Sequence, residues 1–308
     1  MDNIQYLSRL HFLFDNDLPD KVWSNASAVL ERINPDHDFS RISVVFHDVV
    51  DLYQGNYPGY LKVATRYHDL RHIMDIFMCA LRLMHGAHIA GNQFSDDEII
   101  IVAISALMHD IGYAQQIGDE SGTGAKYTKT HVARGIVFMR HYLTAKNWPA
   151  TWLDQIECAM LCTDPALKPS TINFPDERAR MIGMLVGTAD LVGQMADRSY
   201  LEKLLYLYYE FKEAQLGDFE SVQDLLRRTE DFYKITRFKL DDEFNSTYQF
   251  LAAHFKEWFD ADSNYYMESI EKNISYLSQI VQEANGEEFF AHLKRRGIVD
   301  KERATAPE

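Results

Sequence analysis

Residues 95–110, Ser-Asp-Asp-Glu-Ile-Ile-Ile-Val-Ala-Ile-Ser-Ala-Leu-Met-His-Asp, decide the fold of this chain. Ser95 at the N-cap and Glu98 three residues later form a capping box, which marks the start of a helix. From Ile99 to Met108 the residues are apolar except for one serine, so this helix has no face suited to water. The stretch predicts a buried helix that ends on two polar residues, His109 and Asp110.

Helix-period patterns run through almost all of the rest of the 308-residue chain. We expect further helices over about 20–34, 39–53, 66–88, 128–142, 150–162, 176–196, 198–215, 219–256 with a break, 263–284 and 287–295. The chain has 15 Gly and 8 Pro, fewer than usual for its length, which disfavours a turn-rich all-β fold. No hairpin or βαβ pattern interrupts the helices. The predicted fold class is therefore all-α, a compact multi-helix bundle.

The bundle is expected to have one main domain. Residues 1–55 are predicted to form N-terminal helices that pack on the core, residues 56–285 the main domain, and residues 286–308 a short helix and a tail. The polar, glycine-rich stretch 115–127 is expected to be a loop beside the functional site that can act as a lid.

The formal net charge of −15 narrows the range of partners. Such a chain has no general basic face for a nucleic acid polymer or an anionic membrane, but a small phosphate ester can bind where metal ions reverse the local field. No run of 18 apolar residues predicts a membrane span. We expect a cytoplasmic protein with three reduced cysteines, because the sequence has neither a secretory signal nor a disulfide-like cysteine pattern. Homo-oligomer formation stays open.

The pair His109-Asp110 is the first candidate for chemistry. Two polar side chains at the end of a buried helix are costly unless they have partners. A metal ion is a partner that suits an imidazole and a carboxylate at once. The dipeptide alone proves nothing, because His-Asp occurs four times in the chain.

Two further elements carry polar residues where a metal needs ligands. His68 and His72 lie four residues apart in a predicted helix, so both are expected on one helix face, although such a pair is also common as plain structure. Asp190 lies within the apolar run Met184–Val192 and needs a partner there. That partner is either a cation in the core or an arginine such as Arg198, unless this helix face is exposed.

The order of these residues resembles that of the HD-domain metal-dependent phosphohydrolases, most closely the catalytic domain of class I cyclic-nucleotide phosphodiesterases. That family has a Tyr-His-Asn-x-x-His-Ala-x-Asp-Val element, to which residues 67–76, Tyr-His-Asp-Leu-Arg-His-Ile-Met-Asp-Ile, are similar. Its His-Asp, Thr-Asp and Ala-Asp elements are similar to residues 109–110, 163–164 and 189–190. The resemblance spans about residues 60–200 and implies the HD/phosphodiesterase-like bundle.

The resemblance implies a role for each matching residue. A first metal, Zn²⁺ or else Fe, Mn or Co, would be held by His72, His109, Asp110 and Asp190. Asp110 would bridge to a second metal, Mg²⁺ or Mn²⁺. Hydroxide bound by the metals would attack phosphorus, and His68 would protonate the leaving oxygen as general acid. The implied substrate is a phosphodiester or phosphomonoester, such as a nucleotide or a 3′,5′-cyclic nucleotide.

The remaining candidates would line the site. Asp69 or another carboxylate would orient the His68 ring, while His131 and Asp164 would order water near the metals. In some HD proteins the equivalent of His131 is itself a ligand, so its role stays open. Tyr113 stands where the family has a further histidine near the second metal.

Two rival functions remain open. The same ligands can hold two irons in an HD-type di-iron oxygenase, and His131 is the extra histidine that favours it. A catalytically silent, metal-containing nucleotide sensor or scaffold is the other, and Asp69 and Tyr113, which depart from the family pattern, favour it.

Overall fold

Helix α5 (Asp96–Met108) begins and ends as the sequence predicts. The Ser95 side chain accepts a hydrogen bond from the Glu98 backbone N at 3.3 Å, and the Glu98 carboxylate accepts one from the Ser95 backbone N at 2.8 Å. Every residue from Ile99 to Met108 is buried. The capping box and the buried helix are therefore confirmed, and this helix carries His109 and Asp110 at its C-terminal end.

The computed structural model describes residues 16–36, 38–283 and 292–293. This part of the chain contains eleven α-helices and no β-strand, which confirms the all-α fold class. The other helices are α2 (Pro19–Ile33), α3 (Ser40–Gln54), α4 (Leu70–Ile89), α6 (His131–Ala145), α7 (Ala150–Leu161), α8 (Glu177–Ala196), α9 (Tyr200–Glu213), α10 (Val222–Phe238), α11 (Phe250–Phe259) and α12 (Tyr265–Glu283). The break expected within 219–256 is the π-helical turn η4 (Lys239–Glu243) and the 3₁₀ turn η5 (Thr247–Gln249).

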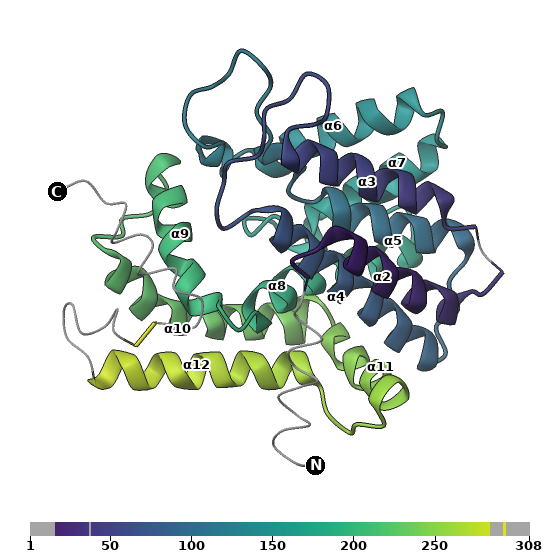
Figure 1. Cartoon of the computed structure of the whole chain (residues 1–308). Helices are drawn as coiled ribbons and strands as arrows, with labels where there is room; N and C mark the ends of the chain where they lie inside the picture. The colour runs from purple at the N-terminus through teal and green to yellow at the C-terminus, as the bar shows by residue number, and fades with distance from the viewer. Residues whose placement is uncertain (1–15, 37, 284–291, 294–308) are drawn as a thin grey trace.

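Helix α4 is the centre of the packing. It contacts α8, α5, α11 and α2, while α3 packs on α5 and α7 packs on α8 (Figure 1). Two glycines let helices come close to α4: a Cβ on Gly193 of α8 would lie 2.7 Å from Ile76 Cδ1, and one on Gly86 would lie 1.8 Å from the Phe250 carbonyl oxygen. This close packing brings the middle of α8 to the first turn of α4.

The predicted helix over 66–88 starts later than expected, and this corrects the placement of His68. Helix α4 begins at Leu70, with Asp69 as the N-cap residue. The Asp69 side chain accepts a hydrogen bond from the His72 backbone N at 2.9 Å. A bond of this kind is typical of an aspartate at the N-cap of a helix. His68 therefore precedes the helix and does not share a helix face with His72.

The loop predicted over 115–127 is present and is tied down at several points. It pairs with residue Tyr60 through an isolated antiparallel bridge at Gln116, and it ends in the 3₁₀ turn η2 (Ala125–Tyr127). Gln115 donates from Nε2 to the backbone oxygens of Asp119 and Ser121 at 2.7 and 2.9 Å. These bonds join the start of the loop to its middle.

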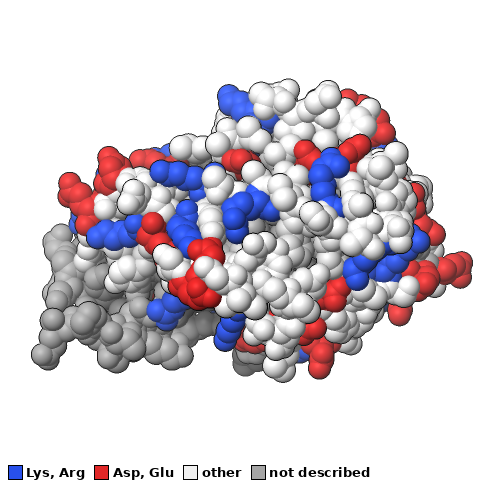
Figure 2. Space-filling model, turned by 90° about the horizontal axis from the view of Figure 1, so that it is seen from above, with Lys and Arg blue, Asp and Glu red and all other residues white. Residues whose placement is uncertain are grey.

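The surface mixes both signs of charge in spite of the net charge of −15. Figure 2 shows one face on which Lys and Arg side chains are interspersed with Asp and Glu. None of the helices in the described part of the chain has the length and apolarity needed to span a membrane. Most of the predicted tail, residues 286–308, and most of its predicted helix 287–295 lie outside the described residues.

Candidate metal centre

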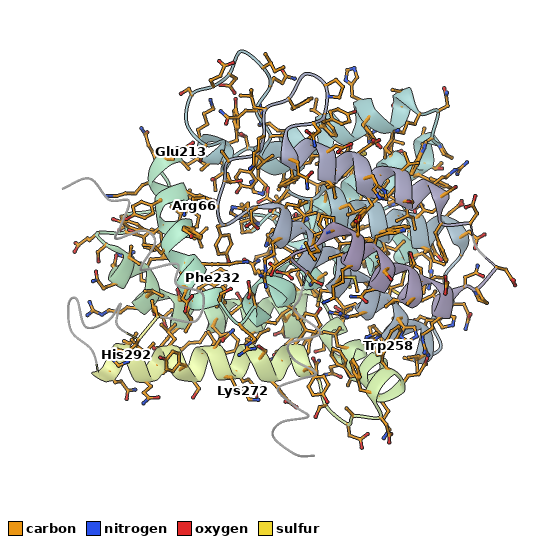
Figure 3. The ribbon with its side chains drawn as sticks, in the orientation of Figure 1. Arg66, Glu213, Phe232, Trp258, Lys272 and His292 are labelled. Carbon is orange, nitrogen blue, oxygen red and sulfur yellow. The ribbon has the colours of Figure 1, made fainter. Side chains whose placement is uncertain are left out.

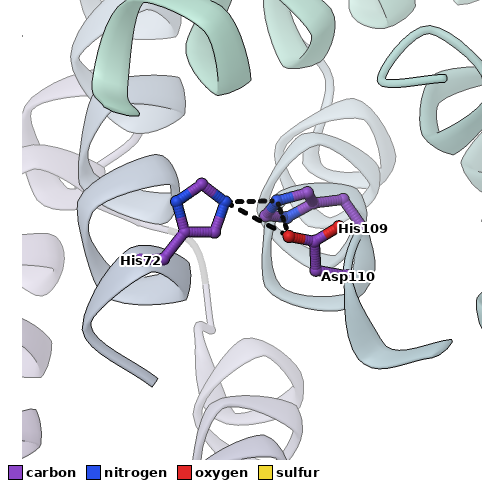
Figure 4. Close-up of side chains that lie close together, drawn as sticks. All are labelled: His72, His109 and Asp110. Atoms are coloured by element: carbon purple, nitrogen blue, oxygen red, sulfur yellow. Dashed lines mark hydrogen bonds and ion pairs between the residues drawn. The ribbon is translucent and has the colours of Figure 1, made fainter. Parts of the chain in front are cut away.

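Three side chains from two neighbouring helices meet in the core. His72 lies in the first turn of α4, and His109 and Asp110 follow the last turn of α5. His72 Nε2 lies 3.2 Å from His109 Nε2 and 3.2 Å from Asp110 Oδ2, and His109 Nε2 lies 3.3 Å from the same oxygen (Figure 4). All three residues are buried and could hold a metal ion together.

Asp190 of α8 adds a fourth side chain, and a second carboxylate oxygen, to this group. Its Oδ1 lies 3.7 Å from both His72 Nε2 and His109 Nε2, and the residue is 9% exposed. The structure thus brings together the four residues that the resemblance implies as ligands of the first metal. They come from three helices that pack on one another around α4.

The hydrogen-bond chemistry of this group fits a cation. His109 Nδ1 lies 2.8 Å from the Ala106 carbonyl oxygen, and because a carbonyl only accepts, this nitrogen carries the proton. In a neutral His109 the lone pair is then on Nε2, where it faces the carboxylate oxygens of Asp110 and Asp190 and the His72 ring. Several acceptors converge on one point, and a divalent cation satisfies all of them at once.

The pKa values of these side chains depend on burial and on the neighbouring carboxylates. Burial lowers the pKa of His72 to about 4, so this ligand is neutral. Burial also acts to lower the pKa of His109, but Asp110 and Asp190 outweigh it and raise the value to about 9. Burial raises the pKa of Asp190 to about 6. A proton on His109 Nε2 is therefore favoured by the two carboxylates that it faces.

His131 approaches Asp110 from the other side. Its Nδ1 lies 2.7 Å from the Thr128 carbonyl oxygen and is therefore protonated, while its Nε2 lies 3.3 Å from Asp110 Oδ1. Asp110 Oδ2 faces His72 and His109, whereas Oδ1 faces His131. The carboxylate therefore lies between His131 and the other two histidines. Gly112 makes this approach possible, because a Cβ there would lie 1.8 Å from the His131 carbonyl oxygen.

His68 is held by a residue that the sequence reasoning did not identify, Glu210 of α9. His68 Nδ1 lies 2.6 Å from Glu210 Oε2, and Glu210 Oε1 accepts the backbone N–H groups of Arg66 and Tyr67, each at 2.7 Å. Burial alone would lower the pKa of His68, but Glu210 and Asp110 together raise it above its ordinary value. The ring is thereby fixed with Nδ1 toward Glu210 and Nε2 free for another contact.

Helix α9 also holds the 115–127 loop. Glu213 lies one turn after Glu210. Its carboxylate accepts hydrogen bonds from the Thr123 backbone N at 2.9 Å and from the Thr123 hydroxyl at 2.8 Å. It also accepts one from the Lys126 backbone N at 3.1 Å. In Figure 3, Glu213 lies on α9, and Arg66, from the segment before α4, lies beside this helix. Two carboxylates of one helix thus fix the segment before α4 and the loop before α6, which are the segments that carry His68 and lead to His131.

The other predicted residues take different positions. The Tyr113 ring stacks on the rings of His68 and His131, with centroid distances of 4.5 and 4.6 Å. Asp69 caps α4, and Glu210 orients the His68 ring. Asp164 lies in the turn after α7, where its Oδ1 accepts the Ala166 backbone N at 2.8 Å.

The sequence did contain a signal for Glu210. It is a carboxylate within the aromatic run Tyr206–Phe211, and it is only 4% exposed. This is the same kind of signal that pointed to Asp190, a charged residue where the helix is otherwise apolar. The aromatic side chains around it are typical of ordinary helix packing, so the acid among them is the only functional signal in this run.

Comparison with protein families gives a similarity over part of the chain. A family model described as Npun_R2479-like matches residues 119–241, about two fifths of the chain. The matched region includes His131, Asp190 and Glu210 and leaves out residues 68–110. No curated protein matches the chain.

Proposed function

We propose that this protein is a metal-dependent phosphohydrolase of the HD type that cleaves a phosphodiester or a phosphomonoester. One observation carries the proposal: a buried group of side chains that could hold a cation lies beside a histidine whose pKa a buried glutamate raises. The ligands suit the binding of metal ions, and the histidine suits the delivery of a proton. Phosphate ester hydrolysis needs both.

His72, His109, Asp110 and Asp190 would hold the first cation, and His131 with Asp110 Oδ1 would contact a second. Divalent cations bound there supply water of lowered pKa and neutralise charge on the phosphoryl oxygens. Asp110 keeps the two positions adjacent, because each of its oxygens faces one of them. Zn²⁺ or another transition metal suits the histidine-rich first position, and Mg²⁺ or Mn²⁺ the second.

His68 would supply the proton to the leaving oxygen. The Glu210 carboxylate fixes Nδ1 and favours the imidazolium form, so the proton would be delivered from Nε2. Tyr113 stacks on the His68 ring and restricts its rotation. The ring therefore needs no reorientation between binding of the substrate and proton transfer.

A nucleotide or a 3′,5′-cyclic nucleotide is the substrate class that we propose, on the strength of the phosphodiesterase-like motif order. The three cysteines are buried thiols, which suits a reducing compartment such as the cytoplasm.

The test is elemental analysis of the purified protein together with hydrolysis of a generic aryl phosphodiester, with and without added Mn²⁺. We expect about two metals per chain and product formation that depends on metal. A protein that holds no metal even after reconstitution contradicts the proposal.

His131 supports a second candidate, a di-iron oxygenase. A third imidazole within 3.3 Å of Asp110 gives the histidine-rich ligand set that two irons favour. Two irons per chain with oxygen consumption and without hydrolysis would favour this candidate over the phosphohydrolase.

A further inference from the structure

Gln194 contacts the carboxylate of Asp190 directly. It lies four residues after Asp190 on α8 and so shares its helix face. Its Nε2 donates to the Asp190 backbone oxygen at 3.0 Å and to Asp190 Oδ1 at 3.3 Å. Asp190 Oδ1 is the same oxygen that lies 3.7 Å from the Nε2 atoms of His72 and His109. The amide therefore acts on the oxygen that faces the metal centre.

Tyr67 bonds the other end of this amide. A glutamine side chain can present either its oxygen or its nitrogen to a neighbour. Because the backbone oxygen of Asp190 only accepts, the amide nitrogen must be directed at Asp190, and Gln194 Oε1 is left to accept from the Tyr67 hydroxyl at 2.9 Å. Tyr67 is itself fixed, because it is 3% exposed and its backbone N is held by Glu210 Oε1.

We infer that Tyr67 and Gln194 are positioning residues that orient Asp190 for cation binding. This inference rests on the proposed metal centre. The amide occupies one side of Asp190 Oδ1 and leaves the other side facing the two histidines. Partners of this kind, which bond a ligand and not the metal, set the affinity of metal sites.

Tyr67 also links the two halves of the site. Its hydroxyl acts through Gln194 on Asp190, while its backbone N shares Glu210 with His68. The cation ligands and the proton donor are thereby held in one hydrogen-bonded network. A change at the tyrosine hydroxyl should reach the cation site without removing any ligand.

The experiment measures Co²⁺ binding, not turnover. The full chain is stripped with a chelator, and the Co²⁺ affinities of wild type, Gln194→Met and Tyr67→Phe are measured by competition with a chromophoric chelator. We expect both variants to bind Co²⁺ at least about tenfold more weakly and to shift its visible absorption bands. Because Tyr67 acts through Gln194, the double variant should bind no more weakly than Gln194→Met. Tyr142→Phe is the control, since it removes another buried tyrosine hydroxyl, one that bonds Asp48, and should keep wild-type affinity.

Thermal unfolding of the metal-free proteins shows whether each variant is folded. Folded variants that bind Co²⁺ like wild type overturn the inference, and additive losses in the double variant overturn the part assigned to Tyr67. If Gln194→Met does not fold, Tyr67→Phe alone decides the question. A wild type that binds no Co²⁺ overturns the proposed metal centre itself, which separates the two failures.

Discussion

His68 Nδ1 lies 2.6 Å from Glu210 Oε2, across 142 positions of sequence. The glutamate is 4% exposed, and its other oxygen accepts two backbone N–H groups from the segment that carries the histidine. Each oxygen of the carboxylate therefore has a fixed donor, so its negative charge stays beside the ring. This arrangement gives His68 its orientation and raises its pKa.

Glu210→Gln tests this relationship. The amide oxygen can still accept from the backbone of Arg66 and Tyr67, but the charge that favours the imidazolium is lost. We expect turnover to fall by about 100-fold with cation affinity unchanged. The high-pH limb of the rate profile, where His68 loses its proton, should move to lower pH.

Glu213→Gln is the matched control for that prediction. It removes a carboxylate from the same helix, one turn further on, that bonds Thr123 and Lys126 and not the histidine. Its pH profile should keep the wild-type limb. Identical profiles for the two variants would show that Glu210 does not act on His68 by its charge.

Asp110→Ala and His68→Ala should separate the cation site from the proton donor. Asp110 faces both sets of ligand atoms, so its removal should abolish turnover and lower the metal content. His68 binds Glu210 and is not among the convergent ligands, so its removal should lower turnover by about 10²- to 10⁴-fold and leave the metal in place. Turnover and elemental analysis on the same samples check both. Loss of all metal from His68→Ala would refute its assignment as a proton donor.

Cation affinity should depend on pH because a proton competes for the same place. The pKa of His109 is about 9 in the metal-free protein, so below that pH the cation must displace one proton. The apparent affinity should therefore rise by about tenfold per pH unit from pH 6 to pH 9 and level off above it. Below about pH 6, where Asp190 also binds a proton, the dependence should become steeper. Chelator competition with Co²⁺ at a series of pH values measures this dependence. An affinity that does not change between pH 6 and pH 8 contradicts the prediction.

The helices could be predicted from the sequence because their signals are local. The capping box at Ser95 and the apolar run after it predict the bounds of α5 to within a residue or two. They also predict that His109 and Asp110 lie at its C-terminal end. His68 was placed on the wrong element because Asp69 was considered only as a partner for the ring. Aspartate is also a favoured N-cap residue, and here that role decides where α4 begins.

The contacts between distant segments could not be predicted in the same way. Periodicity shows that Glu210 and Gln194 lie on helices, but which side chain each one meets depends on how α8 and α9 pack. The close approach of α8 to α4 occurs at Gly193, next to Gln194, whereas the partner of Glu210 depends on the position of α9. The order of the motifs identified the four side chains that converge, whereas Glu210 and Gln194 could be assigned to their partners only from the packed structure.

A second pair of histidines, remote from the metal centre, should make the fold sensitive to acid. His85 of α4 and His254 of α11 are each 1% exposed, and their Nδ1 atoms lie 2.9 Å apart. One nitrogen must donate and the other accept, so both rings cannot be protonated at Nδ1 in this geometry. His254 stacks on Trp258. In Figure 3, Trp258 lies far from Arg66, which belongs to the segment that carries His68.

The surroundings of this pair set the sign of the effect. Burial lowers the pKa of both histidines, and Arg32 adds to it for each, with Arg82 also acting on His254. Glu257, 3.6 Å from His85 Nε2, opposes the shift without reversing it. Because the folded-state pKa values lie below those of the unfolded chain, the pair contributes its full stability above about pH 6.5 and loses it as the pH falls.

His254→Gln isolates that contribution. The glutamine amide can still bond His85 Nδ1. The substitution removes one group that takes up a proton when the chain unfolds. Between about pH 6.5 and 5, the free energy of unfolding of the variant should fall less steeply than that of wild type, by about 1.4 kcal/mol per pH unit. Denaturant unfolding of both proteins in the presence of a chelator measures the difference, in which the other titrating groups cancel. Parallel pH profiles would mean that His254 binds its proton equally well in the folded and unfolded chain, and the packing of α11 on α4 would then have no part in the acid sensitivity.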